Sequence, residues 1–336
     1  MKRCHINTRP FVPKNVLPAL LLLTAACVLQ GGAAAAQGWK PDGPVELIAT
    51  NAPGGGSDRI LRIFVKILGK HIPTTATVVN KPGGGGAIAC NYLNQHPGDG
   101  HYLLLASRSI LTNNIAGHGP SHATMTSVVH LFTEYISIAV KPVSPIKSGT
   151  QLVDFVKRDP AAISFGIATS VGGMNHQGAA TALKVAGIDI KRMKNVIFPS
   201  GGAAVTALLG GHIDVVPISA AFGASLLRNQ QIRMIAVTSP GRLPGVLADV
   251  PTWKEQGFDA EVTTYRYFAG PKGMTPAQIA FWEKTVQSAT QAEEWKKELA
   301  ENYWQHKIMG NAELTAFLAQ DNKIQKTFLA DIGLAK

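Results

Sequence analysis

Short apolar runs alternate with amphipathic stretches along the chain from residue 45 onward. Val45–Ala49, Ala76–Asn80 and Tyr102–Ala106 have the length and apolar content of buried strands. Asp58–Lys70 carries apolar residues every three or four positions, which predicts a helix with one buried stripe, and a second helix is expected over Ala87–Asn94. Such a succession of strand, loop and helix is typical of a mainly parallel sheet that helices cover on both faces.

The same rhythm returns further along the chain and gives way to helices near the C-terminus. Trp295, Leu299 and Tyr303 share one stripe at helical spacing. The expected elements are helices over 150–158 and from the turn at 171–173 through 184, strands over 163–166, 196–198, 213–216 and 234–237, and a mostly helical segment from Thr275 onward.

Two extended, β-rich segments each end at a proline: Glu134–Pro142 and Glu261–Pro271. They would carry the chain out of a first lobe and back into it, as a binding protein that closes about a hinge requires. We therefore expect a two-lobed α/β fold of the periplasmic-binding-protein type, with a ligand cleft between the lobes. Lobe 1 would comprise residues 37–139 and 264–336, and lobe 2 residues 140–263.

The first 36 residues have the features of a secretory signal peptide. Four basic residues surround the start, an apolar run covers Val16–Leu29, and small residues end at Ala36. We expect this segment to be removed and the mature protein to be periplasmic. A membrane anchor is disfavoured because the run is shorter than the roughly 20 residues that span a bilayer. Lipidation at Cys27 is the runner-up, since Thr24 stands where a leucine would be expected.

Charge and cysteine content narrow the function further. The chain has 32 Lys+Arg, 21 Asp+Glu and a net charge of +11. Removing the predicted signal takes four basic and no acidic residues, which leaves about +7. A basic surface steers anions toward a cleft, whereas the absence of Lys/Arg runs argues against a nucleic-acid partner. Only Cys90 lies beyond the signal, so no internal disulfide is expected.

Four glycine-rich turns each precede an expected helix. A helix N-terminus offers unpaired N–H groups and partial positive charge, and glycine lets an anion approach the backbone. Turns of this kind at the carboxyl ends of parallel strands would line the crevice where open α/β sheets bind ligands. Any one of them is also explained by a tight strand-to-helix connection. The turns are Pro53–Asp58, Pro82–Gly86, Ser170–Gly173 and Ser200–Gly202.

Motifs for catalysis, nucleotides and metals are absent from the sequence. It contains no Gly-x-Ser-x-Gly elbow, no His-Glu-x-x-His, no Cys-x-x-Cys and no phosphate-loop sequence. His118 and His122 have a four-residue spacing, but the intervening glycine and proline argue against the helix that would align them. We expect no cofactor, no metal and no catalytic residues.

Several motifs in order resemble the substrate-binding proteins of tripartite tricarboxylate transporters, also called Bug proteins. They are Ala52–Asp58, Val78–Gly86, Pro97–Leu104, Ser170–His176, Gly210–Asp214, Arg233–Ser239 and Val250–Gly257. The resemblance covers nearly all of the chain after the signal. It implies two α/β lobes with a hinge, a small carboxylate bound between them, and membrane transporter subunits as partners.

The resemblance also implies which residues would contact the ligand. Tyr265 would lean over the cleft from the returning crossover, and Ser107 and Ser109 would follow the third strand. The full set of expected ligand-binding residues is Gly55, Gly56, Ser57, Asp58, Gly84, Gly85, Gly86, Ser107, Arg108, Ser109, Ser170, Gly172, Asn175, His176, Ser200, Gly201 and Tyr265.

Some of these residues have a second interpretation. Asp58 would mainly hold the loop and the helix start. Arg108 would either clamp a carboxylate with two hydrogen bonds or lie solvated on a loop, and Arg266 carries the same two interpretations. His176 is more typical of a packed or capping residue than of a general base.

The chain departs from the family pattern near the expected pocket. Phe198-Pro199-Ser200-Gly201 stands where the family usually has Tyr-Lys-Gly-Gly. Pro217-Ile218-Ser219 follows Asp214 where an acidic residue is common, and His101 is an extra residue within an Asp-Gly-Tyr motif. These departures affect the identity of the ligand rather than the family.

The expected function is reversible capture of a small carboxylate for delivery to a membrane transporter, by a monomer and without covalent chemistry. The ligand would be a di- or tricarboxylate or an aromatic carboxylate. The alternatives are a binding protein that presents its ligand to a sensor, and an exported hydrolase.

Overall fold

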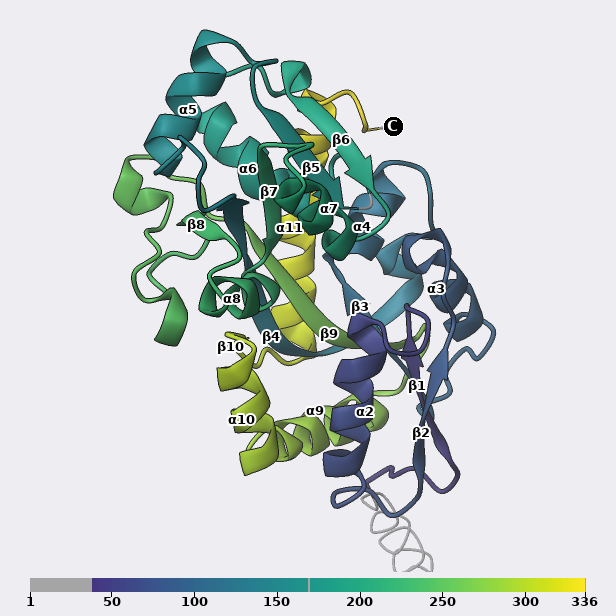
Figure 1. The fold of residues 1–336 in the computed structure, drawn as a ribbon. Coiled ribbons are helices and arrows are strands. Elements are labelled where there is room, and N and C mark those ends of the chain that lie inside the picture. Colours follow the sequence, from purple (N-terminus) through teal and green to yellow (C-terminus); the bar gives the residue numbers. More distant parts are fainter. Residues whose placement is uncertain (1–37, 169, 336) are drawn as a thin grey trace, which may run out of the picture. The chain divides into compact units, whose positions relative to one another are not determined.

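The first strands and helices of the fold alternate along the chain (Figure 1). The computed structural model describes residues 38–168 and 170–335, so the predicted signal peptide and Cys27 lie outside the described residues. Strand β1 (Val45–Ala49) pairs in parallel with β2 (Ala76–Asn80) and β3 (Tyr102–Ser107). Apolar residues recur on one face of helix α2 and are buried there, as their spacing predicts. The helices after these strands are α2 (Gly56–Leu68), α3 (Ala87–Leu93) and α4 (Arg108–Ile115).

A second group of parallel strands lies further along the same sheet. Strand β5 (Ser164–Ala168) pairs in parallel with β6 (Lys194–Phe198) and β7 (Val215–Ser219). The complete path is β2-β1-β3-β9-β4-β7-β5-β6, and β8 (Arg233–Val237) and β10 (Gln305–His306) both pair with β4. The helices of this part are α5 (Gly149–Arg158), α6 (Met174–Val185), α7 (Gly201–Leu209) and α8 (Ala220–Arg228).

Two antiparallel strands connect the two groups. Strand β4 (Met125–Val140) pairs with β9 (Thr263–Pro271) as far as Tyr135, and from Ile136 onward it pairs with β7. The chain therefore passes from one group to the other between these two residues. Both expected crossovers fall mainly on β4 and β9.

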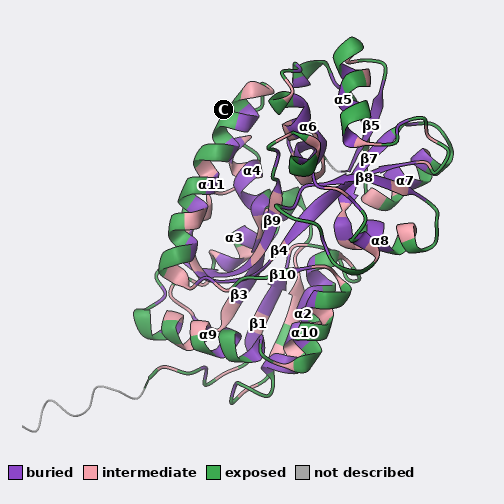
Figure 2. Cartoon of the chain, turned by 90° about the vertical axis from the view of Figure 1, so that its left-hand side faces the viewer, coloured by how far each residue is buried: buried purple, intermediate pink, exposed green. Residues whose placement is uncertain are grey.

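The C-terminal helix contacts the hydrophobic cores of both groups. Leu314 and Leu318 of α11 (Asn311–Asp331) belong to a core cluster with β1, β3 and β9, whereas Phe328 and Leu329 belong to one with β5 and α6. The helix runs alongside both groups in Figure 1. Figure 2 shows buried residues along the strands and exposed residues on the outer helix faces. The remaining elements are α9 (Pro276–Ala289), α10 (Glu293–Glu301) and the short 3-10 helices at 84–86, 122–124, 190–192, 245–247 and 254–256.

Two local expectations differ from the structure. Arg108 was expected on a loop, but it begins α4 directly after β3, with Ile110 and Ile115 buried on the inner face of the helix. Tyr303 lies outside α10 with a φ of 55°, so only Trp295 and Leu299 form the expected stripe. Within residues 38–168 and 170–335, no helix combines the length and the apolar character needed to cross a membrane.

Candidate functional site

A cavity with a volume of about 860 Å³, which we call the main cleft, opens at the carboxyl ends of five parallel strands. Residues that follow β1, β2, β3, β5 and β6 line it, and this is the edge where open α/β sheets bind ligands. Its lining residues are Thr50, Asn51, Ala52, Ser57, Pro82, Gly83, Gly84, Gly85, Gly86, Leu105, Ser107, Ser109, Ile110, Thr112, Asn113, His118, Ala168, Ser170, Gly173, Met174, Asn175, Pro199 and Arg266.

Asp58 holds the first glycine turn from behind rather than lining the main cleft. Its buried carboxylate accepts hydrogen bonds from the Gly54 backbone N–H (2.8 Å) and the Asn80 amide (2.9 Å). The Arg62 guanidinium also donates to it at 2.9 Å. These donors, Arg62 foremost, lower the pKa of Asp58 to about 2. Ser57, one residue earlier, does line the cleft.

The second glycine turn depends on glycine at successive positions. Gly83, Gly84, Gly85 and Gly86 all have positive φ, between 56° and 122°. The Asn113 amide of α4 donates to the Gly85 carbonyl at 2.9 Å, and a Cβ atom on Gly85 would come within 1.9 Å of that amide nitrogen. The turn is therefore held against the cleft-facing side of α4.

The turn before α6 contributes only part of its expected residues. Ser170 and Asn175 line the main cleft, but a Cβ atom on Gly172 would come within 2.7 Å of Leu329 in α11. His176 is fully buried, and burial lowers its pKa to about 4. Gly172 and His176 therefore pack the interior beside the cleft instead of lining it.

Ser200 and Gly201 begin helix α7. The exposed Ser200 hydroxyl accepts a hydrogen bond from the Ala203 backbone N–H at 3.2 Å, as an N-cap residue does. Neither residue is part of the main-cleft lining, to which this turn contributes Pro199.

Arg108 and Tyr265 belong to a buried polar cluster and do not line the main cleft. Arg108 Nε and Nη2 each donate to the Asp321 carboxylate at 3.2 Å, and the Tyr265 hydroxyl donates to it at 2.6 Å. The Arg108 and Asp321 side chains are 8% and 5% exposed. Burial, and next the Asp321 charge, hold the pKa of Tyr265 well above its usual value. The Arg108 guanidinium, at the first residue of α4, therefore points to α11, where its charge is paired with Asp321.

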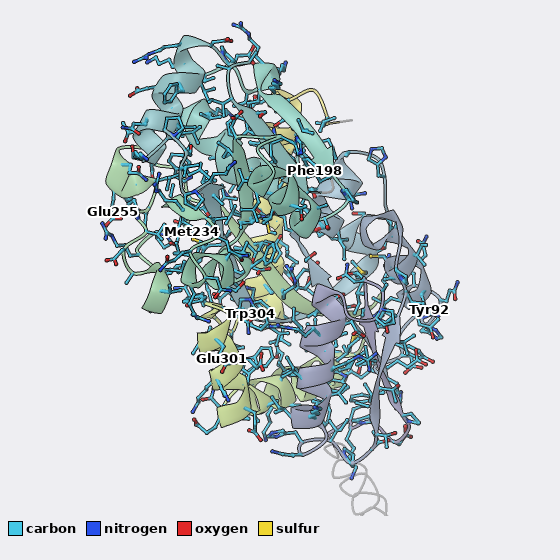
Figure 3. All side chains as sticks on the ribbon, in the orientation of Figure 1. Tyr92, Phe198, Met234, Glu255, Glu301 and Trp304 are labelled. Carbon is cyan, nitrogen blue, oxygen red and sulfur yellow. The ribbon has the colours of Figure 1, made fainter. Side chains whose placement is uncertain are left out.

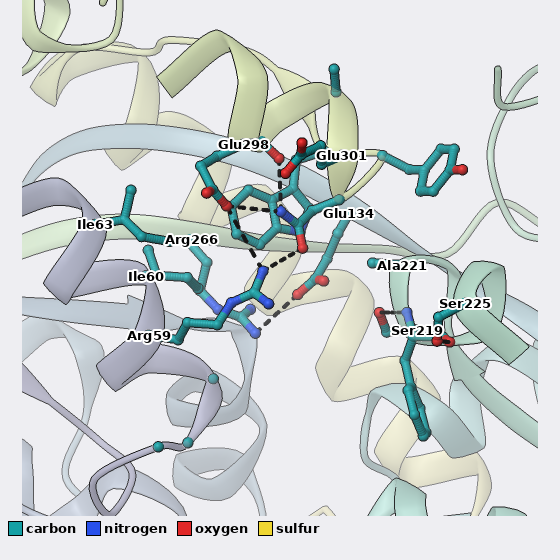
Figure 4. A pocket seen from close by; sticks show the side chains of 18 of the residues that line it. Arg59, Ile60, Ile63, Glu134, Ser219, Ala221, Ser225, Arg266, Glu298 and Glu301 are labelled. Atoms are coloured by element: carbon teal, nitrogen blue, oxygen red, sulfur yellow. Dashed lines mark hydrogen bonds and ion pairs between the residues drawn. The ribbon is translucent and has the colours of Figure 1, made fainter. Parts of the chain in front are cut away.

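A second cavity of about 1060 Å³, which we call the lateral cavity, shares Arg266 with the main cleft. Figure 4 shows the lateral cavity from close by. Gly55 and Gly56 line it together with side chains from α2, α8 and α10. Arg59 pairs there with Glu298 and Asn302. Glu301, the last residue of α10, and Trp304, three residues later, also line it. Both residues are labelled in Figure 3.

Arg266 of β9 is common to the linings of both cavities. Its Nη2 pairs with Glu134 Oε1 of β4 at 2.9 Å (Figure 4). Among the described residues that line the main cleft, it is the one Asp, Glu, Lys or Arg side chain. The electrostatic character of the cleft is thus hydroxyl and amide groups plus one cation, which suits an anion.

The sequence-based selection missed several cleft residues. Thr112 and Asn113 lie one helical turn beyond Ser109 on α4, so spacing would have identified them had α4 been recognised. Thr50 and Asn51 directly follow β1, so their position at the carboxyl end of a parallel strand, which also indicated the glycine turn, could have identified them. Within residues 38–168 and 170–335, no group of His, Cys, Asp and Glu side chains could hold a metal ion.

Comparison with known proteins agrees with this architecture. Residues 60–334 match the model of the tripartite tricarboxylate transporter family receptor. A UPF0065 protein of Agrobacterium vitis is 30% identical over 73% of this chain and 70% of its own length. A TctC solute-binding protein from Polaromonas, solved without ligand, has a TM-score of 0.73 and 24% identity over 86% of this chain and 99% of its own. An R. palustris protein solved with adipate has a TM-score of 0.76 and 20% identity over 88% and 99%. These matches confirm the predicted family and the two-lobed α/β fold class.

Proposed function

Because the chain belongs to the tripartite tricarboxylate transporter receptor family, we propose that it binds a small carboxylate in the main cleft for delivery to a membrane transporter. The observation that best supports this proposal is the position and chemistry of the main cleft. It lies at the carboxyl ends of five parallel strands. The described residues that line it contribute hydroxyls, amides and one guanidinium, and no carboxylate. The R. palustris neighbour solved with adipate supports a ligand of this class.

Eight of the expected ligand-binding residues line this cleft and form the proposed contact set. A ligand carboxylate would accept hydrogen bonds from the serine hydroxyls and from the backbone N–H groups of the glycine turn. These residues are Ser57, Gly84, Gly85, Gly86, Ser107, Ser109, Ser170 and Asn175.

Closure and export complete the proposal. Residues 37–139 with 264–336 would move against residues 140–263 about β4 and β9, and so enclose the ligand. Export by the segment over residues 1–36 would place the protein in the periplasm, where receptors of this family act.

A thermal-shift screen of the purified protein tests the ligand class. The panel holds mono-, di- and tricarboxylates, aromatic carboxylates, amino acids, sugars and phosphates. A ligand at 100 times its Kd adds about 2.7 kcal/mol of stability, so a bound carboxylate should raise Tm clearly. Stabilisation by sugars alone, or turnover of an ester, would contradict the proposal.

A matched pair of variants ties the shift to the main cleft. Ser109 is exposed and lines the cleft, whereas Ser288 is exposed on the outer face of α9. Ser109→Trp should abolish the carboxylate shift by filling the cleft, and Ser288→Trp should preserve it. Equal responses of the two variants would place the binding site elsewhere.

A further inference from the structure

Residues of β9 and β4 hold the Arg266 guanidinium in place, while one of its nitrogens makes no hydrogen bond among the described residues. Its Nη1 donates to the Thr264 hydroxyl at 3.3 Å and to the Tyr265 carbonyl at 3.1 Å, and its Nη2 pairs with Glu134. Within residues 38–168 and 170–335, its Nε has no hydrogen-bond partner. An oriented guanidinium with an unused N–H donor can donate a hydrogen bond to a ligand oxygen without further ordering.

The pair occupies the place where the two groups of strands meet. Glu134 directly precedes Tyr135, the last residue of β4 that pairs with β9. Arg266 of β9 pairs with Phe132 of β4 and so lies diagonally across from Glu134. The side chains remain 19% and 12% exposed for Arg266 and Glu134, in that order. Arg266 lines both the main cleft and the lateral cavity, whereas Glu134 is in the lining of the lateral cavity and not of the main cleft.

We propose that Arg266 binds the second carboxylate of a dicarboxylate ligand, and that Glu134 competes with that carboxylate for the guanidinium. This inference rests on the proposed function, which supplies the first carboxylate site at the glycine turns. A ligand with one carboxylate would leave the Glu134–Arg266 pair intact. A ligand with two would reach Arg266 only if it spans the cleft, so both charge and chain length would be selected.

The alternative roles of the pair make different predictions. If Glu134 instead recognised a ligand ammonium group, its neutralisation would weaken binding of amino acids. If the pair only joined β4 to β9, changes to either residue would lower Tm without any preference among ligands. A competing carboxylate is the one role in which removing the negative charge strengthens binding.

The experiment compares Kd values for straight-chain dicarboxylates of three to seven carbons with those for the monocarboxylates of the same lengths. Calorimetry would be done on the full protein and on Arg266→Gln, Arg266→Lys and Glu134→Gln. Arg266→Gln should weaken the best dicarboxylate about ten- to hundred-fold and leave its monocarboxylate counterpart within about two-fold. Arg266→Lys should lie between, because it keeps the charge but loses the planar fork. Glu134→Gln should tighten dicarboxylate binding several-fold.

The outcomes separate this inference from the proposed function. Equal losses for mono- and dicarboxylates in Arg266→Gln, or weaker dicarboxylate binding in Glu134→Gln, would overturn the role of Arg266 while carboxylate binding stands. Weaker binding of amino acids in Glu134→Gln would assign the pair to an ammonium group instead. If wild-type protein binds no carboxylate of either kind, both proposals fail. Melting curves of each unliganded variant confirm that the compared proteins are folded.

Discussion

Replacing Asp321 with alanine should destabilise the protein far more than an average substitution does. Its carboxylate accepts hydrogen bonds from Arg108, from the Tyr265 hydroxyl and from the Gln325 amide, the last at 3.1 Å. Asp321→Ala would leave the Arg108 guanidinium buried with the Thr263 hydroxyl as its remaining side-chain acceptor. An uncompensated charge in a buried site is costly because the interior solvates it poorly.

The size of the loss follows from the burial of the pair. Both side chains are less than a tenth exposed, so solvent screening is weak. Breaking a buried ion pair by removing one partner costs about 3–5 kcal/mol. Typical domains have only about 5–15 kcal/mol of stability, so the variant would lose a large share of it. Replacing both partners, as in Arg108→Met with Asp321→Leu, should restore most of the loss because no charge remains buried.

Urea unfolding followed by tryptophan fluorescence measures both variants. The free energy of unfolding should fall by about 3–5 kcal/mol for Asp321→Ala and by clearly less for the double variant. A loss below about 1 kcal/mol for Asp321→Ala would show that water or a rearranged side chain compensates Arg108, and would refute the reasoning. A double variant less stable than Asp321→Ala would refute it as well.

Three other predictions concern residues around the main cleft. The pKa of Asp58 in the folded protein is lowered to about 2, so the stability that its carboxylate contributes is present above about pH 4 and is lost as pH falls toward 2. Asp58→Asn should therefore reduce the change of the urea midpoint with pH between these values. His176 stays neutral in the folded state down to about pH 4, whereas the unfolded imidazole binds a proton below about pH 6.5. The free energy of unfolding of the wild-type protein should therefore decrease as pH falls from about 6.5 to about 4. His176→Gln should make this dependence on pH less steep. Gly85→Ala should weaken carboxylate binding about ten-fold or more, because both its φ and the Asn113 contact oppose a Cβ atom. Gly172→Ala, which meets α11 instead, should lower Tm with Kd little changed; the reverse pattern would contradict the placement of both glycines.

Sequence patterns predicted the parts of this protein that depend on local signals. Strands such as Val45–Ala49 and Ala76–Asn80 have the predicted bounds, because an apolar run between turn residues is a local feature. The glycine turn over Gly83–Gly86 was recognisable for the same reason, since its backbone conformations require glycine.

The residues that differed from expectation depend on partners far away in the sequence. Arg108 meets Asp321, 213 residues later, and Gly172 meets Leu329 of the same helix. No spacing rule connects positions so distant, and α11 carries no motif that points to them. Sequence patterns placed Arg108 among the ligand-binding residues, but the packing of α11 pairs its guanidinium with Asp321 in the interior.

Arg266 shows why similarity to known proteins predicts the type of binding site more readily than the identity of the ligand. Backbone donors at glycine turns depend on the fold, and solved structures at 20% and 24% identity share that fold. Side-chain charge depends on single positions: Pro199 lines the cleft where the family resemblance would place a lysine. The cleft therefore draws its positive charge from β9 rather than from the turn before α7. On the proposal made above, a second ligand carboxylate therefore pairs with Arg266, because the lining contributes a proline and no charged group at position 199.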